Sequence, residues 1–382
     1  MKIVQIIITF PAVFIAAFFC HSGLALDMVT VRLGKAEEKL EGRIIAEDIE
    51  GNLVLENRAG AWFKVEKDHV AARTSDARAF VPYTQEEMIP LLKQEFPEPF
   101  QVLQTKRYLI VYDTSPAYAQ WCGSQLERLQ TAFVLQWKRK GFELHEPEFP
   151  LTTILFANRK DFILYVKREF ADIGETIAAY YNLNTNRIVC SDLTGMERYG
   201  EGGNRLTPSQ KREFLSRRGA AQSISTFVHE ATHQIAFNSG IHQRYGACPL
   251  WLSEGIAMLY EPPDLDSIQG WSADIKINPV RLYDLREFMQ KNPRDVIRKM
   301  ICSDEALRNP ETIHDHYATA WALVYYLSKK RSKEFTKYVR RISEKPPFEQ
   351  DPEEKRLEDF ESIFGSDWPR FYREFTKYVM SL

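Results

Sequence analysis

Two histidines, His229 and His233, stand four positions apart in the segment 225–237, and Glu230 directly follows the first. Residues four positions apart on a helix share one face, so both imidazoles can reach a single metal ion. Glu230 would then lie beside the pair, where a general base is needed to take a proton from a metal-bound water. The alternative is a surface helix with two solvated histidines, which the apolar neighbour Phe227 disfavours. The spacing therefore predicts a metal site on a helix.

A catalytic zinc site needs a third protein ligand and an open coordination position. The extended motif H-E-x-x-H-x-x-G-x-x-H is excluded, because Ser239 stands where its third histidine would be. Glu254, within W-L-S-E-G-I-A on a second expected helix opened by Pro249, is the better candidate. A carboxylate on an apolar helix is costly to bury unless a ligand compensates it. The alternative is an exposed carboxylate near a helix start, and His242 is the next candidate ligand.

The run H-E-A-T-H-Q, followed by W-L-S-E-G-I-A, resembles the gluzincin branch of the zinc metallopeptidases, the peptidase MA clan. It is most similar to a group of secreted bacterial proteins of unassigned function. The resemblance covers residues 225–260 and, more loosely, 317–327. It implies a zincin-like fold in which one Zn²⁺ per chain is bound by His229, His233 and Glu254.

The same resemblance implies that Glu230 is the general base and that an upstream mixed sheet has an edge strand lining the cleft, either 179–182 or 187–189. The chain departs from the best-studied gluzincins at Met258, where an acid would orient a ligand histidine, so that acceptor must come from elsewhere. For the donor to a developing oxyanion, the resemblance favours Tyr317, with His316 as the second choice. The alternative for Tyr317 is a packing role at a helix start.

These residues predict a secreted zinc-dependent hydrolase, a metallopeptidase that cleaves peptide bonds by Glu-assisted attack of zinc-bound water. Two alternatives stay open. One is a zinc hydrolase of a non-peptide amide or ester. The other is a catalytically silent zincin-fold protein of the cell envelope, which the complete set of ligands and base disfavours. Substrate specificity and the choice between exo- and endo-cleavage are not encoded in these motifs.

Residues 1–25 have the pattern of a secretory signal peptide, with Lys2, an apolar run over 3–19, and small residues at Gly23 and Ala25. A membrane anchor is the alternative, and the short run broken by Pro11 disfavours it. The chain is therefore expected to be secreted or to reside in the periplasm or cell envelope, with no later membrane segment. After cleavage the chain retains four cysteines, for which disulfides and isolated thiols are both open: Cys122, Cys190, Cys248 and Cys302.

Composition places the chain among folded proteins, since its 382 residues are 44% hydrophobic and 27% charged. The net charge of −2 argues against nucleic acid as a partner. The partner that the metallopeptidase resemblance implies is a peptide or protein substrate. Short strands predict a small β-barrel-like accessory module over 26–75, which could dock an unknown partner. The catalytic domain is expected over 76–382, with an α/β part (76–215) and a helical part (216–382).

Strands that precede helices predict an α+β fold rather than a doubly wound sheet. Periodicity and turn signals predict the individual elements. Helices are expected at 85–95, 116–140, 160–170 and 225–237, with another starting at Thr207, and strands at 108–112, 151–156, 178–182 and 187–190.

Overall fold

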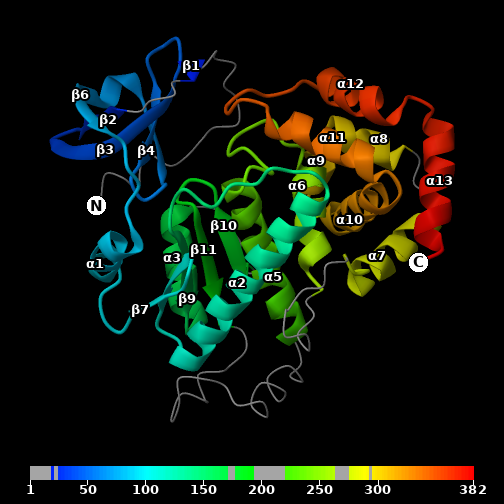
Figure 1. The fold of residues 1–382 in the computed structure, drawn as a ribbon, viewed down its shortest axis with the longest axis horizontal. Coiled ribbons are helices and arrows are strands. Elements are labelled where there is room, and N and C mark those ends of the chain that lie inside the picture. Colours follow the sequence, from blue (N-terminus) through cyan, green and yellow to red (C-terminus); the bar gives the residue numbers. More distant parts are fainter. Residues whose placement is uncertain (1–18, 21–24, 171–176, 193–219, 263–274, 292–294) are drawn as a thin grey trace. The chain divides into compact units, whose positions relative to one another are not determined.

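The computed structural model describes residues 19–20, 25–170, 177–192, 220–262, 275–291 and 295–382 (Figure 1). The protein is a mixed α+β molecule with an N-terminal β module and a helical C-terminal half. Its contacts group the chain into two compact units, Met1–Glu127 with Pro147–Ser223, and Arg128–Glu146 with Ile224–Leu382. The domain boundaries expected at 75/76 and 215/216 stay predictions.

The N-terminal β module is an antiparallel sheet in the order β5-β4-β3-β2-β6. Alternating apolar residues such as Val29 and Val31 point to one side and form a core of their own with Ile44 and Leu55. The short strand β1 (Phe19–Cys20) pairs with β3, and most of the expected signal peptide lies outside the described residues. The strands are β2 (Ala25–Leu33), β3 (Ala36–Glu47), β4 (Leu53–Asn57), β5 (Trp62–Val65) and β6 (Val70–Ala79).

A second, five-stranded sheet has the order β10-β11-β9-β8-β7. Its three inner strands run parallel, and both edge strands run antiparallel to their neighbours. The sheet is therefore mixed, as expected, and only β7 was missing from the sequence prediction. The strands are β7 (Gln101–Gln104), β8 (Tyr108–Tyr112), β9 (Leu151–Phe156), β10 (Ala179–Asn182) and β11 (Arg187–Ser191).

The helices α1 (Gln85–Glu95) and α3 (Arg159–Glu169) cover one face of this sheet and share its apolar core. Each begins at a residue that suits an N-cap. Thr84 and Glu87 form a reciprocal capping box at α1, and the Asn158 side chain accepts a hydrogen bond from the Asp161 backbone at α3. The long helix α2 (Pro116–Arg139) follows β8. These elements were predicted from periodicity and caps.

The second unit is built around α10 (Ile313–Lys330), which packs against α6, α7, α9, α11 and α13 (Figure 1). The middle of α10, from Ala318 to Ser328, is buried, because its apolar residues continue around the helix. The other helices of this unit are α5 (Ala220–Asn238), α6 (Leu250–Tyr260), α7 (Pro279–Gln290), α8 (Val296–Cys302), α9 (Glu305–Arg308), α11 (Ser332–Ser343), α12 (Glu353–Phe364) and α13 (Trp368–Met380).

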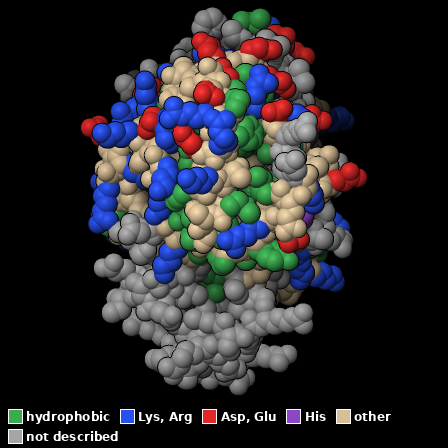
Figure 2. Space-filling model, turned by 90° about the vertical axis from the view of Figure 1, so that its right-hand side faces the viewer, with side chains coloured by type: hydrophobic (Ala, Val, Ile, Leu, Met, Phe, Trp, Pro, Cys, Tyr) green, Lys and Arg blue, Asp and Glu red, His purple; other side chains and the backbone are tan. Residues whose placement is uncertain are grey.

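The C-terminal helices α11 and α13 are amphipathic. They bury rings such as Phe335 and Phe375 and expose basic side chains such as Lys337 and Arg373. Figure 2 shows Lys and Arg side chains beside hydrophobic ones on this face of the molecule. Some of these cations are paired, as Arg370 is with Glu374 at 2.8 Å.

The structure also bears on the cysteines, on the helix start expected at Thr207 and on membrane-spanning helices. The cysteines Cys122, Cys190, Cys248 and Cys302 are free thiols. The helix start expected at Thr207 lies outside the described residues. In the part of the chain that is described, we find no helix with both the length and the hydropathy of a membrane span.

Helix α6 lies close to α10 at Gly255. A Cβ atom at this position would lie 2.8 Å from the backbone oxygen of Ala320 and would also clash with Val324. Real Cβ atoms do not come so close to backbone atoms, so the glycine lets the two helices pack tightly. The contact also sets the position of the neighbouring Glu254.

We predict that Gly255→Ala lowers the free energy of unfolding by about 1–3 kcal/mol, because the added methyl overpacks this contact. Urea denaturation followed by circular dichroism measures the change. Lys337→Ala, at an exposed position of α11, is the control and should stay within about 0.5 kcal/mol of the wild type. An equally stable Gly255→Ala protein would show that α6 and α10 are not tightly packed.

Candidate metal centre

Helix α5 places both histidines on a buried face. Ile224, Val228 and Ile235 are buried along the helix and supply the apolar contacts that the sequence pattern indicates. The helix ends at Asn238, and Gly240 follows with φ of 91°, a conformation that glycine adopts without strain. The expected helix over 225–237 is confirmed.

Helix α6 begins after Pro249, and all of its residues are apolar except Ser253 and Glu254. Every residue from Trp251 to Tyr260 is buried except Glu254, which is the only charged residue of the helix. The side chain of Glu254 is still only 14% exposed. A carboxylate in such surroundings needs partners with positive charge or hydrogen-bond donors.

The partners of Glu254 are the two histidines of α5. The Nε2 atom of His229 lies 3.0 Å from one Glu254 oxygen, and the Nε2 atom of His233 lies 3.5 Å from the other. The two Nε2 atoms are 3.1 Å apart. Ligands about 2.0–2.2 Å from a tetrahedral zinc are separated by about 3.3–3.6 Å. The three side chains therefore have nearly the spacing of zinc ligands, and among the described residues they form a group able to hold a metal ion.

Each ring is oriented through its other nitrogen. The Nδ1 atom of His229 lies 3.0 Å from a Glu261 carboxylate oxygen, and the Nδ1 atom of His233 lies 3.3 Å from the Ser253 hydroxyl. A ring that donates its Nδ1–H to such an acceptor presents the Nε2 lone pair to a metal. This arrangement suits the donor set of a zinc site.

Glu261 accepts the hydrogen bond that orients the His229 ring. The sequence alone left this acceptor unassigned, because Met258 stands at the position where an acid was expected. Glu261 is buried and held by Arg281 at 2.9 Å and by the Asn278 amide at 2.6 Å. Sequence reasoning missed Glu261, Ser253 and Arg281. The signal for Glu261 was its position two helical turns after Glu254, which places both acids on one side of α6.

The electrostatics of the cluster favour positive charge between the rings. Burial disfavours a charged imidazole, but hydrogen bonds to Glu254 and Glu261 outweigh burial and raise the pKa of His229. Burial likewise disfavours ionised Glu254, and the charge of His233 with the hydrogen bonds from both rings keeps its pKa below the usual range. Arg281 already balances Glu261, so Glu254 is left to attract a cation, either a proton or a metal ion.

Glu230, the expected general base, and Tyr317, the expected oxyanion donor, lie near His229 and Glu254. Glu230 is partly buried on α5, close enough for its charge to act on His229 and Tyr317. Tyr317 lies on α10 with the Arg281 guanidinium 5.7 Å from its ring centroid. Burial, followed by the Glu254 and Glu230 carboxylates, raises the pKa of Tyr317.

His316, the second candidate for the oxyanion donor, and His242, the next candidate for the third ligand, make contacts of other kinds. His316 has its Nδ1 atom 2.9 Å from the Thr312 carbonyl oxygen and its ring against Phe288. His242 is buried, and its Nδ1 atom lies 3.5 Å from the Cys248 sulfur. Burial lowers the pKa of His242 to about 3. His242 is not part of the group formed by His229, His233 and Glu254.

Part of the chain matches a protein-family model. Residues 223–349, a third of the chain, match a family model described as a protein of unknown function, DUF1570. The matched segment contains both histidines, Glu254, Glu261, Arg281 and Tyr317. No curated protein matches the chain.

We predict that Glu261→Ala weakens Zn²⁺ binding by about 10–100-fold, because the His229 ring loses the acceptor that orients it. Competition with a fluorescent zinc chelator measures the dissociation constant. Glu287→Ala, at an exposed position of α7, removes an acid of the same type and should leave the constant unchanged. Equal losses in the two variants would mean that Glu261 acts only through the net charge.

Proposed function

We propose that this protein is a zinc-dependent hydrolase, and specifically a metallopeptidase of gluzincin type with a zincin-like fold. The observation that carries the proposal is the convergence of His229, His233 and Glu254. Their facing atoms have nearly the spacing of zinc ligands. The hydrogen bonds on the outer nitrogens support it further, since they leave both Nε2 atoms directed at one point.

When bound, Zn²⁺ would supply Lewis-acid activation of a water molecule and of a substrate carbonyl. The chain supplies the remaining groups. Glu230 takes the proton from the attacking water and passes it to the leaving amine. The Tyr317 hydroxyl donates a hydrogen bond to the oxygen on which negative charge develops. Glu261 and Ser253 hold the imidazoles in place during the reaction.

Export belongs to the proposal as well. The apolar run over 3–19 and the small residues Gly23 and Ala25 support a cleaved signal peptide. The protein would then act outside the cytoplasm, in the periplasm, the cell envelope or the medium. Its substrate would be a peptide or protein, and the β module over 26–75 could dock a partner.

Protein purified without chelator is predicted to contain one zinc per chain by mass spectrometry of the metal. Glu254→Ala should weaken Zn²⁺ binding by more than about 100-fold, a larger loss than removal of an outer hydrogen-bond partner causes. Glu254→Ala with unchanged affinity would place the third ligand elsewhere, with His242 as the next candidate. Folded wild-type protein that binds no zinc would end the proposal.

Glu230→Gln is predicted to keep its zinc and to lose about 10²–10⁴-fold in hydrolysis, because the amide cannot take a proton from water. The measurement compares proteome-wide cleavage products of the wild type and the variant. Glu344→Gln, at an exposed position, serves as the control and should give the wild-type products. If wild type and Glu230→Gln give identical products, Glu230 is not the base. If the wild type gives no products of its own, the protein is not a peptidase.

Tyr317→Phe removes one hydroxyl and is predicted to lower kcat by about 10²–10³-fold while KM and zinc content stay close to those of the wild type. The reason is that the hydroxyl acts on charge that develops only in the transition state. Steady-state kinetics on a peptide from the cleavage profile measure both constants. A change in KM alone would assign Tyr317 to substrate binding.

A further inference from the structure

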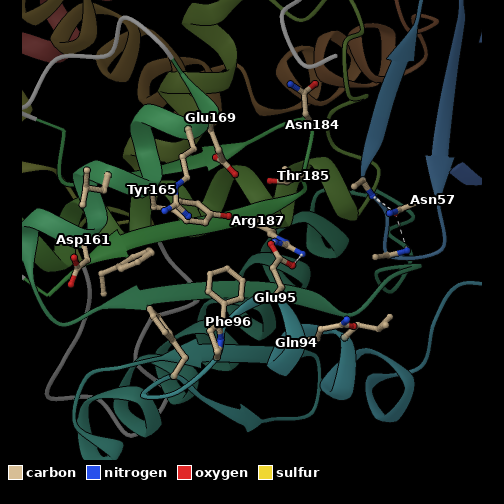
Figure 3. A pocket seen from close by; sticks show the side chains of 18 of the residues that line it. Asn57, Gln94, Glu95, Phe96, Asp161, Tyr165, Glu169, Asn184, Thr185 and Arg187 are labelled. Atoms are coloured by element: carbon tan, nitrogen blue, oxygen red, sulfur yellow. Dashed lines mark hydrogen bonds and ion pairs between the residues drawn. The ribbon is translucent and has the colours of Figure 1, made fainter. Parts of the chain in front are cut away.

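The first unit contains a cavity of about 830 Å³. It lies between the C-terminal end of α1, helix α3, the turn that joins β10 to β11, and the β4–β5 turn of the β module. Figure 3 shows Arg187 and Glu95 at its centre, Tyr165 and Glu169 to one side and Asn57 on the other. None of the residues of the candidate metal centre lines it. The volume falls within the range of sites that enclose drug-sized ligands.

One wall of the cavity is aromatic. The rings of Phe96, Phe100, Phe156 and Tyr165 form a continuous layer, with neighbouring centroids 5.4–5.9 Å apart. Such a layer offers ring faces to apolar groups and to cations. It extends the apolar core of the sheet to the surface of the cavity.

The rim of the cavity exposes further apolar surface. Leu91 on α1 is 45% exposed and Leu164 on α3 is 49% exposed, and both line the cavity. Exposed leucines at the mouth of a pocket mark it as a binding surface more strongly than scattered ones do. Among the described residues, the buried hydroxyl of Thr185, which also lines the cavity, has no hydrogen-bond partner.

The charge of the lining is acidic. The lining contains four acids and two arginines: Glu95, Glu98, Asp161, Glu169, Arg168 and Arg187. Arg187 is neutralised by Glu95 through two hydrogen bonds of 2.7 and 2.9 Å. The hydrogen bonds that Glu169 accepts, from Tyr180 at 2.7 Å and Asn182 at 2.8 Å, come from uncharged donors. The net charge of the side chains that line the cavity is therefore negative, which favours a positively charged ligand.

We propose that this cavity binds a short peptide segment in which a basic side chain stands beside apolar ones. A lysine or arginine has an apolar stem, which suits the aromatic layer, and a cationic head, which suits Glu169. The exposed leucines extend the surface beyond one side chain and would cover the apolar neighbours. The site is separate in its residues from the metal centre, so it does not depend on the proposed hydrolysis.

The test uses the full chain with Glu230→Gln, so that the probe is not cleaved, and isothermal titration calorimetry. The probes are acetyl-Leu-Arg-Phe-amide and the same peptide with glutamine or glutamate at the centre. The arginine peptide is expected to bind at least about tenfold more tightly than the glutamine peptide, and the glutamate peptide most weakly.

Two substitutions then locate the site. Glu169→Gln keeps an oxygen that can accept from Tyr180 and should weaken binding of the arginine peptide about tenfold, the loss of one charge-assisted interaction. Leu164→Ser should weaken it about threefold to tenfold through lost apolar contact. The controls are Glu354→Gln, at an exposed position, and Leu135→Ser, at a leucine 51% exposed on α2; neither should change binding.

Leu164 is exposed, so its replacement tests the site even if Glu169→Gln fails to fold. The proposal is overturned if the three peptides bind equally, if the arginine peptide does not bind, or if the controls weaken binding as much as the cavity variants. It is also overturned if removal of zinc with a chelator abolishes binding, because the peptide would then occupy the metal centre. Calorimetry reports binding alone, so absence of peptidase activity would not affect the result.

Discussion

A buried carboxylate with two imidazoles as its partners is the interaction on which the helical unit depends. Glu254 is the only charge on a helix that is otherwise apolar and buried, and its ionised form would be unstable there without compensation. His229 and His233 supply that compensation from α5. The arrangement requires α5 and α6 to keep a fixed mutual position, because a small shift would leave the acid unpaired.

Further contacts hold that position. Glu261 continues the cluster from the end of α6, and Arg281 and Asn278 bind it from the start of α7. The close contact of Gly255 with α10 sets the depth of α6. Three helices that follow one another with long connections thus meet at one centre, and α10 brings Tyr317 to it. The helices are held together at this centre by contacts between buried polar groups and by close backbone packing. Such contacts fix the positions of the side chains at the centre.

The two units offer different chemistry. The helical unit presents nitrogen and oxygen donors that converge on a point, which suits a small divalent cation. The unit with the two sheets presents an acidic and aromatic cavity, which suits a larger organic cation. Under the two proposals, the chain would bind a polypeptide segment independently of the metal.

The sequence by itself determined the local elements and predicted which side chains gather at the candidate metal centre. The strands over 108–112 and 151–156 and the helix of His229 follow from periodicity that any fold must satisfy, because one face of each must be buried. A buried partner for Glu254 could be inferred because an acid on an apolar helix requires one, and the structure pairs it with His229 and His233. Glu261 as the acceptor for His229 and Arg187 as the partner of Glu95 were decided only by the tertiary structure. Such contacts join residues on different elements, and no spacing along the chain records the packing that brings them together.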